Sequence, residues 1–599
     1  MCGIVGYTGE RETAKVLIDG LKKLEYRGYD SAGIVISENS LKSFKTKGKV
    51  KELEDLVNKS AFDIKSIAGL GHTRWATHGI PNDVNSHPHS SNDMTISLVH
   101  NGIIENYAEI KEKLKSEGYI FHSETDTEVC VNLIHYNYKN HGKNKFEAIR
   151  ESLKEIDGHY ALGMIFEDEK DAIYVTRLQN PLVIGLGEGE NFIASDFTPA
   201  LSYTKNFYLL EEGEIAKITR KEVIVLDKFD KLKQVEKYTV DWNIEAAEKG
   251  GFEHFMLKEI HEQPKAVLDT ITDNINREFL SENIIKNASK VHIVACGSAY
   301  HAGIVAKPII EKLAKLSTEV YYASEFRYTE PLILKGDICI IISQSGETAD
   351  TLAALRYAKK EGAVTLSIVN VLGSTIDRES EYSVYTKAGP EIAVATTKAY
   401  SSQLVLLYLI SIRIGDVIYR LSNKEELLNE IKLIPSQIEE LLTYKDVIKQ
   451  YAKSFNYAKS AFIIGRGLDF AAAMEASLKL KEISYIHSEA YAAGELKHGT
   501  ISLIEQGTPV LAIATQNTAE KTVSNLLETI SRGASPLIFT NKKLNLDVEV
   551  KTFKLPNTNE MFMPSLVAIP LQFFAYFSAH IRSCDIDMPR NLAKSVTVE

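Results

Sequence analysis

Short apolar runs separated by polar turns dominate the chain up to about residue 228. Runs of this kind are typical of β-strands, and segments in which apolar residues recur every three or four positions predict a few helices between them. We expect helices at about Arg11 to Leu24 and Asp126 to Tyr138, with Asp126 as the cap of the second. The predicted strands are Ile4 to Tyr7, Ser31 to Ser37, Thr95 to His100, Tyr160 to Phe166, Ala172 to Val175, Leu182 to Leu186 and Glu214 to Ile218. The pattern indicates an α+β domain.

From about residue 285 the pattern changes to strand, glycine-containing turn and helix in alternation, which predicts parallel sheets covered by helices. The alternation also repeats, since residues 290–313 parallel residues 460–482, and residues 336–363 parallel residues 507–534. A repeat of this size predicts two copies of one α/β domain. We therefore expect a domain over residues 1–228, a linker over 229–250, α/β domains over 251–445 and 446–585, and a tail over 586–599.

The composition narrows the classes of function. A net charge of −11 disfavours nucleic-acid binding, and 44% hydrophobic with 25% charged residues is typical of a folded globular protein. No segment resembles a signal peptide, and no apolar run reaches the roughly 18 residues of a membrane span. The five cysteines are scattered and show neither a disulfide nor a zinc pattern. We expect a cytoplasmic protein that binds neither nucleic acid nor a membrane.

A first candidate site begins at Cys2. Removal of Met1 would give Cys2 a free α-amine beside its thiol, and an amine with a reference pKa near 8 accepts a thiol proton near neutral pH. A cysteine at this position also occurs by chance, so the following segments decide between the two readings. They are HTRWATHG from His72, NSHPH from Asn85, HNGIIENY from His100 and SETDTE from Ser123.

These segments supply the groups that a glutamine amidase needs. A guanidinium binds the α-carboxylate, an acid binds the α-ammonium, and N–H groups stabilise the oxyanion. In this order the segments resemble the class II glutamine amidotransferases, whose N-terminal-nucleophile fold packs two β-sheets between helices. The resemblance implies Cys2 as the nucleophile and Asn101 with Gly102 as the oxyanion hole. The glutamine-binding residues that it implies are Arg74, Thr77, His78 and Asp126, and Trp75 is a candidate gate for ammonia.

Loop histidines leave a metal site as an alternative for the same domain. Imidazole is the commonest zinc ligand, but no cysteine or carboxylate set completes a coordination sphere here, and hydrogen-bonded loop histidines are commoner. We expect neither a metal nor an organic cofactor. The histidines concerned are His72, His78, His87 and His89.

A second candidate site follows the apolar strand 337–342. The segment SQSGET combines hydroxyls, a glycine and a helix start, which favours phosphate, although a plain helix cap has the same pattern. The second copy reads ATQNTA at this place, so it has lost the cradle. The first copy resembles sugar isomerase domains, and the resemblance implies a phosphosugar here. Its implied contacts are Ser343, Gln344, Ser345 and Thr348, with Gly297, Ser298, Val394, Ala395, Thr396 and Lys398 lining the pocket.

The second copy offers different chemistry. Lys479 and Glu482 lie three residues apart on one predicted helix face, and His498 follows a glycine-containing loop. Such residues either form a solvated charged face or serve ring opening and proton transfer in a sugar.

Over its full length, the chain resembles the isomerizing glutamine–fructose-6-phosphate aminotransferase family. The resemblance implies an imine between Lys594 and the keto sugar, an ammonia channel lined by Ala593, and Glu482 as the base for C1 and C2. It also implies His498 as the ring-opening group. One departure from the family is Ala299, where a second hydroxyl residue is common, and this departure puts one hydrogen bond to the sugar in doubt.

The implied reaction converts fructose 6-phosphate and glutamine to glucosamine 6-phosphate and glutamate, the first step of hexosamine synthesis, in a homodimer. An amidotransferase for another phosphosugar, or a deglycase, is an alternative enzyme. A non-catalytic phosphosugar sensor is an alternative from another class, but a sensor would not need Cys2 or Lys594. Phosphoribosyl amidotransfer is disfavoured because the chain has no extended pyrophosphate-binding segment.

Overall fold

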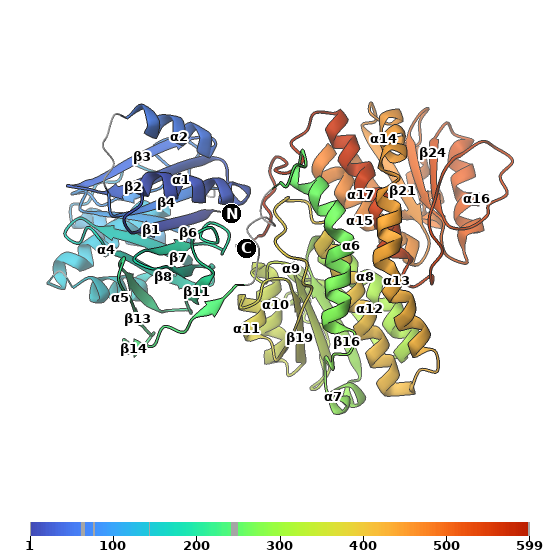
Figure 1. The fold of residues 1–599 in the computed structure, drawn as a ribbon, viewed down its shortest axis with the longest axis horizontal. Helices are drawn as coiled ribbons and strands as arrows, with labels where there is room; N and C mark the ends of the chain where they lie inside the picture. The colour runs from blue at the N-terminus through green and yellow to red at the C-terminus, as the bar shows by residue number, and fades with distance from the viewer. Residues whose placement is uncertain (1, 61–65, 76–77, 143, 241–248, 597–599) are drawn as a thin grey trace. The chain divides into compact units, whose positions relative to one another are not determined.

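The computed structural model describes residues 2–60, 66–75, 78–142, 144–240 and 249–596. The chain divides into two compact units, Met1–Ile244 together with Ser595–Glu599, and Glu245–Lys594. Each unit has its own sheets and its own apolar core (Figure 1).

Two antiparallel sheets form the centre of the first unit. Their strand orders are β15-β11-β9-β10-β1-β4-β2-β3 and β14-β13-β12-β8-β7-β6-β5. The first sheet consists of β1 Gly3–Thr8, β2 Ser31–Ser37, β3 Leu41–Lys47, β4 Ala68–Arg74, β9 Val183–Leu186, β10 Asn191–Ala194, β11 Asn206–Leu209 and β15 Tyr238–Thr239. The second consists of β5 His89–Ser90, β6 Ile96–Ile104, β7 Gly158–Phe166, β8 Ile173–Leu178, β12 Ile215–Ile218, β13 Val223–Leu226 and β14 Leu232–Lys233.

The two sheets pack face to face. Ile4 and Leu70 of the first sheet share a cluster of fully buried residues with Val99 and Ile165 of the second. Helix α1 packs on the first sheet and α4 on the second, so the layers run helix, sheet, sheet, helix (Figure 1). This layering confirms the α+β N-terminal-nucleophile fold. The helices are α1 Thr13–Leu24, α2 Val50–Lys59, α3 Tyr107–Ser116, α4 Asp126–Asn140 and α5 Lys145–Glu155.

Most of the predicted elements in this unit are present, but one helix cap differs. The expected cap of α4, Asp126, is its first helical residue, and Thr125 caps the helix by accepting a hydrogen bond from the Glu128 N–H. The Asp126 carboxylate instead accepts the Ile104 N–H at 2.9 Å. Within the expected linker, β14 is the edge strand of the second sheet, beside β13, and β15 is the edge strand of the first sheet, beside β11. Residues 241–248 lie outside the described residues.

The second unit contains two five-stranded parallel sheets, which confirms the repeat of one α/β domain. Their orders, β17-β16-β18-β19-β20 and β22-β21-β23-β24-β25, correspond strand by strand. The first sheet consists of β16 Lys290–Ala295, β17 Ser317–Tyr322, β18 Ile338–Ser343, β19 Val364–Val369 and β20 Tyr382–Tyr385. The second consists of β21 Ser460–Gly465, β22 His487–Ala492, β23 Pro509–Ile513, β24 Ser535–Thr540 and β25 Lys551–Lys554.

Helices join the two copies through one apolar core. Helix α8 packs against α12 and α15, and α15 packs against α17, so α8 of the first copy touches α15 of the second. The helices are α6 Phe255–Asn274, α7 Glu282–Asn287, α8 Gly297–Ala314, α9 Ala323–Phe326, α10 Ala349–Lys360, α11 Thr375–Glu379, α12 Lys398–Tyr419, α13 Lys424–Leu442, α14 Lys445–Ser454, α15 Leu468–Ser484, α16 Ala519–Ile530 and α17 Met563–Ile581.

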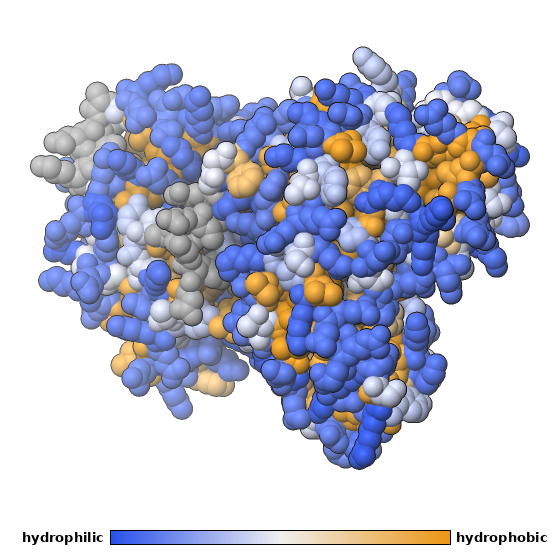
Figure 2. Space-filling view, turned by 45° about the vertical axis from the view of Figure 1, so that its right-hand side comes forward, coloured by the Kyte–Doolittle hydropathy of each residue, from blue (hydrophilic) through white to orange (hydrophobic). Residues whose placement is uncertain are grey.

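Two of these helices, α12 and α17, are long and apolar enough to cross a membrane by length and composition alone. In this structure 78% and 89% of their apolar windows are buried inside the protein, as in the core helices of a soluble protein. The face in Figure 2 is mostly hydrophilic, with apolar residues in scattered groups. The two apolar helices are therefore core elements of the second unit.

Candidate active sites

The Cys2 thiol lies beside the end of β4. Strands β1 and β4 pair in antiparallel register with Gly3 opposite Thr73, so Cys2 comes next to Trp75. The Trp75 N–H donates to Cys2 Sγ at 3.3 Å. Burial raises the pKa of the Cys2 thiol, while the positive amino terminus, this N–H and Arg74 act in the opposite direction. Because burial prevails, a base must take the thiol proton before attack.

Arg74 has a guanidinium nitrogen available for an anion. Its Nη2 donates to the carbonyl oxygens of His78 and Gly79, the second at 3.2 Å. Its buried Nη1 has no hydrogen-bond partner among the described residues. Leaving such a donor unpaired is costly, so the arrangement favours a bound carboxylate.

Asn101 and Gly102 lie next to each other on β6. Ser195 Oγ accepts one hydrogen bond from Asn101 Nδ2, at 2.9 Å, and another from the Ile4 N–H, at 2.8 Å. Ser195 therefore connects β6 with β1. Gly102 has φ +132°, and a Cβ there would lie 2.0 Å from the His159 carbonyl oxygen. Only glycine fits this backbone.

Of the remaining predicted glutamine-binding residues, the structure describes Asp126 and His78. Asp126 is buried and contributes to the electrostatics of both Cys2 and Arg74, so it belongs to this site. His78 contributes its backbone carbonyl to Arg74. Thr77 lies outside the described residues. The ring of Trp75 meets Tyr29 edge to face, with 5.6 Å between centroids.

The clustered histidines have hydrogen-bonding roles. His72 contacts the His100 carbonyl oxygen at 2.9 Å and Asn101 Oδ1 at 3.1 Å, and its ring stacks on His87. Burial lowers the pKa of His72 to about 3, so the ring is neutral at physiological pH. Among the described residues, no group of three or more His, Cys, Asp and Glu side chains could hold a metal ion.

The expected phosphate cradle lies between β18 and α10. Ser343 Oγ accepts the Gly346 N–H and contacts Thr348 Oγ1, both at 3.0 Å. Thr348 precedes α10 without capping it through its side chain, so its hydroxyl does not occupy the N–H groups of the first turn. Because β16 and β18 are parallel neighbours, Gly297 and Ser298 at the start of α8 lie at the same sheet edge.

In the second copy an internal carboxylate fills the corresponding place. Asp469 accepts the Thr515 N–H at 2.8 Å and the Gln516 N–H at 3.2 Å, and also binds the Thr515 hydroxyl. Asp469 is buried in the first turn of α15, where the first copy has Ala299. A fixed anion therefore stands where the first copy has an open cradle.

The Lys479 and Glu482 pair is not a solvated helix face. Only 1% of the Lys479 side chain is exposed, and its Nζ lies 2.6 Å from Glu482. Burial raises the pKa of Glu482, although Lys479 partly offsets this effect. His498 is exposed at the end of a short 3₁₀ helix, and no hydrogen bond or ion pair joins it to either residue.

The first part of the tail, residues 586–594, contacts the first α/β copy. The Asp587 carboxylate accepts the N–H groups of Phe255 and Met256 at the start of α6, and the Asp587 carbonyl accepts the Val394 N–H. Lys594 forms an ion pair with Glu391 and contacts Thr396 Oγ1 at 3.3 Å. The loop 394–396 and the tail lysine thus meet, whereas Lys398 is turned to Glu262 at 2.7 Å.

Sequence reasoning missed several acidic residues around this site. Glu391 forms an ion pair with Lys594. Burial and the negative charge of Glu391 raise the pKa of the adjacent Glu259 to about 8. Glu475 accepts hydrogen bonds from Ser298 and His301 of the first copy. One signal for Glu475 was present, because it lies four residues before Lys479 on the same helix face.

Family models match both halves of the chain. The model of the glutamine amidotransferase domain matches residues 72–202. The SIS domain model matches residues 284–413 and 454–581, one match for each α/β copy.

Curated relatives extend the match to the whole chain. A glutamine–fructose-6-phosphate aminotransferase (isomerizing) of Clostridium tetani is 51% identical, and one of Methanosarcina mazei is 46% identical, each over 100% of both chains. A solved structure, the C-terminal domain of glucosamine-fructose-6-phosphate aminotransferase from Francisella tularensis, is 38% identical with a TM-score of 0.55. It covers 57% of this chain and 99% of its own.

The amidotransferase domain of the first unit and the paired SIS domains of the second agree with these full-length relatives. The chain therefore belongs to the glutamine–fructose-6-phosphate aminotransferase (isomerizing) family of enzymes.

Proposed function

We propose that this chain transfers the amide nitrogen of glutamine to fructose 6-phosphate and isomerises the product to glucosamine 6-phosphate, in the cytoplasm. The observation that carries the proposal is the position of Lys594, which meets the 394–396 loop of the first SIS domain. The same unit holds the buried Lys479 and Glu482 pair. An amine and a proton-transfer pair in one site fit imine chemistry at a keto sugar.

In the first unit, the Cys2 sulfur attacks the amide carbon of glutamine. The Cys2 α-amine, free once Met1 is removed, takes the thiol proton and passes it to the leaving ammonia. Asn101 Nδ2 and the Gly102 N–H stabilise the oxyanion, and water then releases glutamate from the thioester. Arg74 Nη1 and Asp126 bind the α-carboxylate and α-ammonium, with Thr77 and His78 beside them.

In the second unit, the phosphate occupies the cradle formed by Ser343, Gln344, Ser345 and Thr348. Lys594 attacks C2 of the open-chain sugar and expels water, and ammonia then displaces the lysine from C2. Glu482 moves a proton from C1 to C2 while the C1 hydroxyl loses its proton and the nitrogen gains one, which leaves an amine on C2 and an aldehyde at C1. Gly297, Val394 and Ala395 line the pocket, and no cofactor takes part.

We further propose that ammonia travels internally between the two reactions. Trp75 would act as the gate because its backbone N–H donates to the Cys2 sulfur, which places this residue beside the nucleophile. Ala593 would line the route because it precedes the imine-forming lysine in the tail. Free ammonia would be lost to water, so hydrolysis without a sugar acceptor would waste glutamine.

Coupling between the two reactions gives a direct test of the proposed function. Saturating fructose 6-phosphate should raise the rate of glutamate release by at least about tenfold, on the order of a 1.4 kcal/mol lower barrier. Glucose, which lacks the phosphate, is the matched control and should leave the rate unchanged. Equally fast hydrolysis without fructose 6-phosphate would contradict the proposal.

His498 suggests that the active site needs a second copy of the chain. It is exposed and unconnected to Lys479 and Glu482, so we propose that it opens the sugar ring in the partner of a homodimer. Mixing inactive His498→Ala and Lys594→Arg chains should then restore about a quarter of the activity, because half of random dimers regain one of two sites. No recovery after subunit exchange would contradict this arrangement.

A further inference from the structure

Glu475 is a buried carboxylate at the contact between the two SIS domains. It lies on α15 of the second copy, and 4% of its side chain is exposed. One oxygen accepts the Ser298 hydroxyl at 2.9 Å, and the other contacts His301 Nδ1 at 2.8 Å. Both partners lie on α8 of the first copy.

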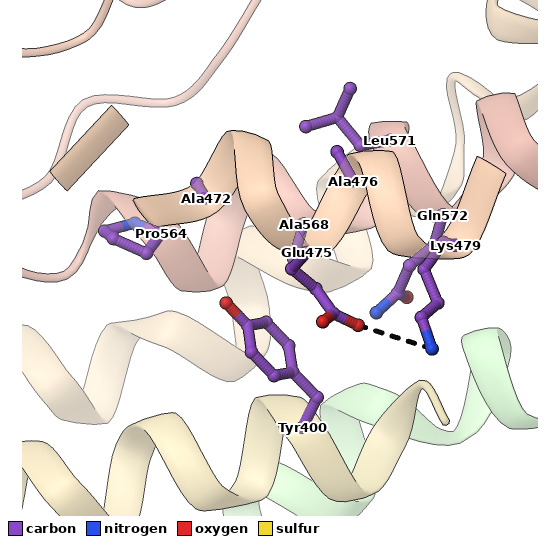
Figure 3. Close-up of a pocket in the computed structure, with 9 residues that line it drawn as sticks. All are labelled: Tyr400, Ala472, Glu475, Ala476, Lys479, Pro564, Ala568, Leu571 and Gln572. Carbon is purple, nitrogen blue, oxygen red and sulfur yellow. Dashed lines mark ion pairs between the residues drawn. The ribbon is translucent and has the colours of Figure 1, made fainter. Parts of the chain in front are cut away.

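The surroundings fix this carboxylate in place. Figure 3 shows Glu475 and Lys479 on one face of α15, with Glu475 directed toward Tyr400 and a dashed line marking the ion pair between Glu475 and Lys479. Lys479 Nζ lies 3.5 Å from Glu475 and 2.6 Å from Glu482. Glu475 therefore contacts Lys479 on one side and the start of α8 on the other.

The bond to Glu475 determines what Ser298 can offer a ligand. A serine hydroxyl has one proton, and an ionised carboxylate can only accept. Once Ser298 Oγ donates to Glu475, only its lone pairs remain for the pocket. A phosphate needs donors, whereas a sugar hydroxyl can donate to Ser298.

The position of Ser298 agrees with a contact to a sugar hydroxyl and not to the phosphate. It is the second residue of α8, at the same sheet edge as the phosphate cradle, and Cys296 Sγ contacts Thr351 Oγ1 of α10 at 3.7 Å. The cradle has its own donors in the Ser345 and Thr348 hydroxyls and in the first backbone N–H groups of α10. The neighbouring Ala299 side chain offers no hydrogen bond, so Ser298 carries the hydroxyl contact of this turn.

We propose that Glu475 is a positioning residue that holds Ser298 as a hydrogen-bond acceptor for a hydroxyl of the phosphosugar. The site thereby selects the phosphosugar over inorganic phosphate. The inference rests on the proposed function of the cradle as the phosphosugar site. Glu475 acts through Ser298, so removing either group should cost the same interaction.

Two probes separate the sugar from the phosphate. Sorbitol 6-phosphate is an open-chain polyol phosphate without a carbonyl, so it binds without forming an imine, and inorganic phosphate reports the cradle alone. Ser298→Ala and Glu475→Leu should each weaken sorbitol 6-phosphate binding about tenfold in titration calorimetry, with phosphate binding changed less than about twofold. Thr348→Val should weaken both probes.

A double-mutant cycle tests the dependence of one residue on the other. The Ser298→Ala/Glu475→Leu variant should bind sorbitol 6-phosphate about as weakly as either single variant, because one interaction is lost in all three. Glu475→Gln should stay within about threefold of the unmodified chain, since its amide oxygen still accepts the Ser298 hydroxyl. If Glu475→Leu fails to fold, Ser298→Ala alone still tests whether this hydroxyl binds the sugar and not its phosphate.

Distinct results would overturn distinct claims. Additive losses in the double variant, or a parallel loss of inorganic phosphate binding in Ser298→Ala, would refute the role of Glu475. An unmodified chain that binds neither probe would instead refute the proposed phosphosugar site, and the inference with it.

Discussion

Replacing Cys2 with alanine should abolish glutamine hydrolysis, with a loss of roughly 10³-fold or more in kcat, while sorbitol 6-phosphate still binds. The loss is large because the thiolate forms the covalent intermediate and no neighbouring group can replace it. The Trp75 backbone N–H would lose its acceptor, the Cys2 sulfur. Glutamate release, measured with fructose 6-phosphate present, checks this result.

The matched control is Cys130→Ala in the same unit. Cys130 is fully buried within α4, and burial raises the pKa of its thiol, so it is no nucleophile. Its replacement should leave kcat for glutamine within about threefold of the unmodified chain. Hydrolysis that survives in Cys2→Ala but is lost in Cys130→Ala would reverse the assignment.

Replacing Lys594 with arginine should abolish glucosamine 6-phosphate formation, again by roughly 10³-fold or more. Arginine keeps the positive charge that pairs with Glu391, but it stays protonated and cannot form an imine. The substitution therefore separates chemistry from charge pairing. Borohydride reduction in the presence of fructose 6-phosphate should attach a sugar to Lys594 in the unmodified chain and none to the variant, by peptide mass.

Lys542→Arg is the control for this substitution. Lys542 also forms an ion pair with a glutamate, Glu560, at 2.9 Å, but this pair is half-buried on the second SIS domain. Its replacement should change neither product formation nor borohydride trapping. A trapped sugar on a lysine other than Lys594 would contradict the proposed imine.

Periodicity predicted the folds because both are built from repeated local signals. The sequence alternation of strand, turn and helix is maintained over two copies, and the structure shows two sheets of identical strand order. Local signals were weaker where neighbouring residues have similar propensities. Thr125 and Asp126 are both good caps, and a long-range bond to the Ile104 N–H decided between them.

Contacts between distant segments could not be read from spacing. Glu475 lies 177 residues from Ser298 and Glu391 lies 203 residues from Lys594, so only the packing of the two copies and the tail reveals these pairs. Asp469 shows the same limit. The sequence indicated that the second copy had lost the cradle, but not that a carboxylate from α15 fills it.

Nitrogen transfer from amide-labelled ¹⁵N-glutamine to fructose 6-phosphate, in excess unlabelled ammonium, tests the central claim most directly. The account predicts glucosamine 6-phosphate that carries the label undiluted, and no labelled product from Cys2→Ala or Lys594→Arg chains. Glutamate that accumulates without labelled amino sugar, or a product whose label is diluted by the ammonium, would contradict internal transfer from Cys2 to the sugar.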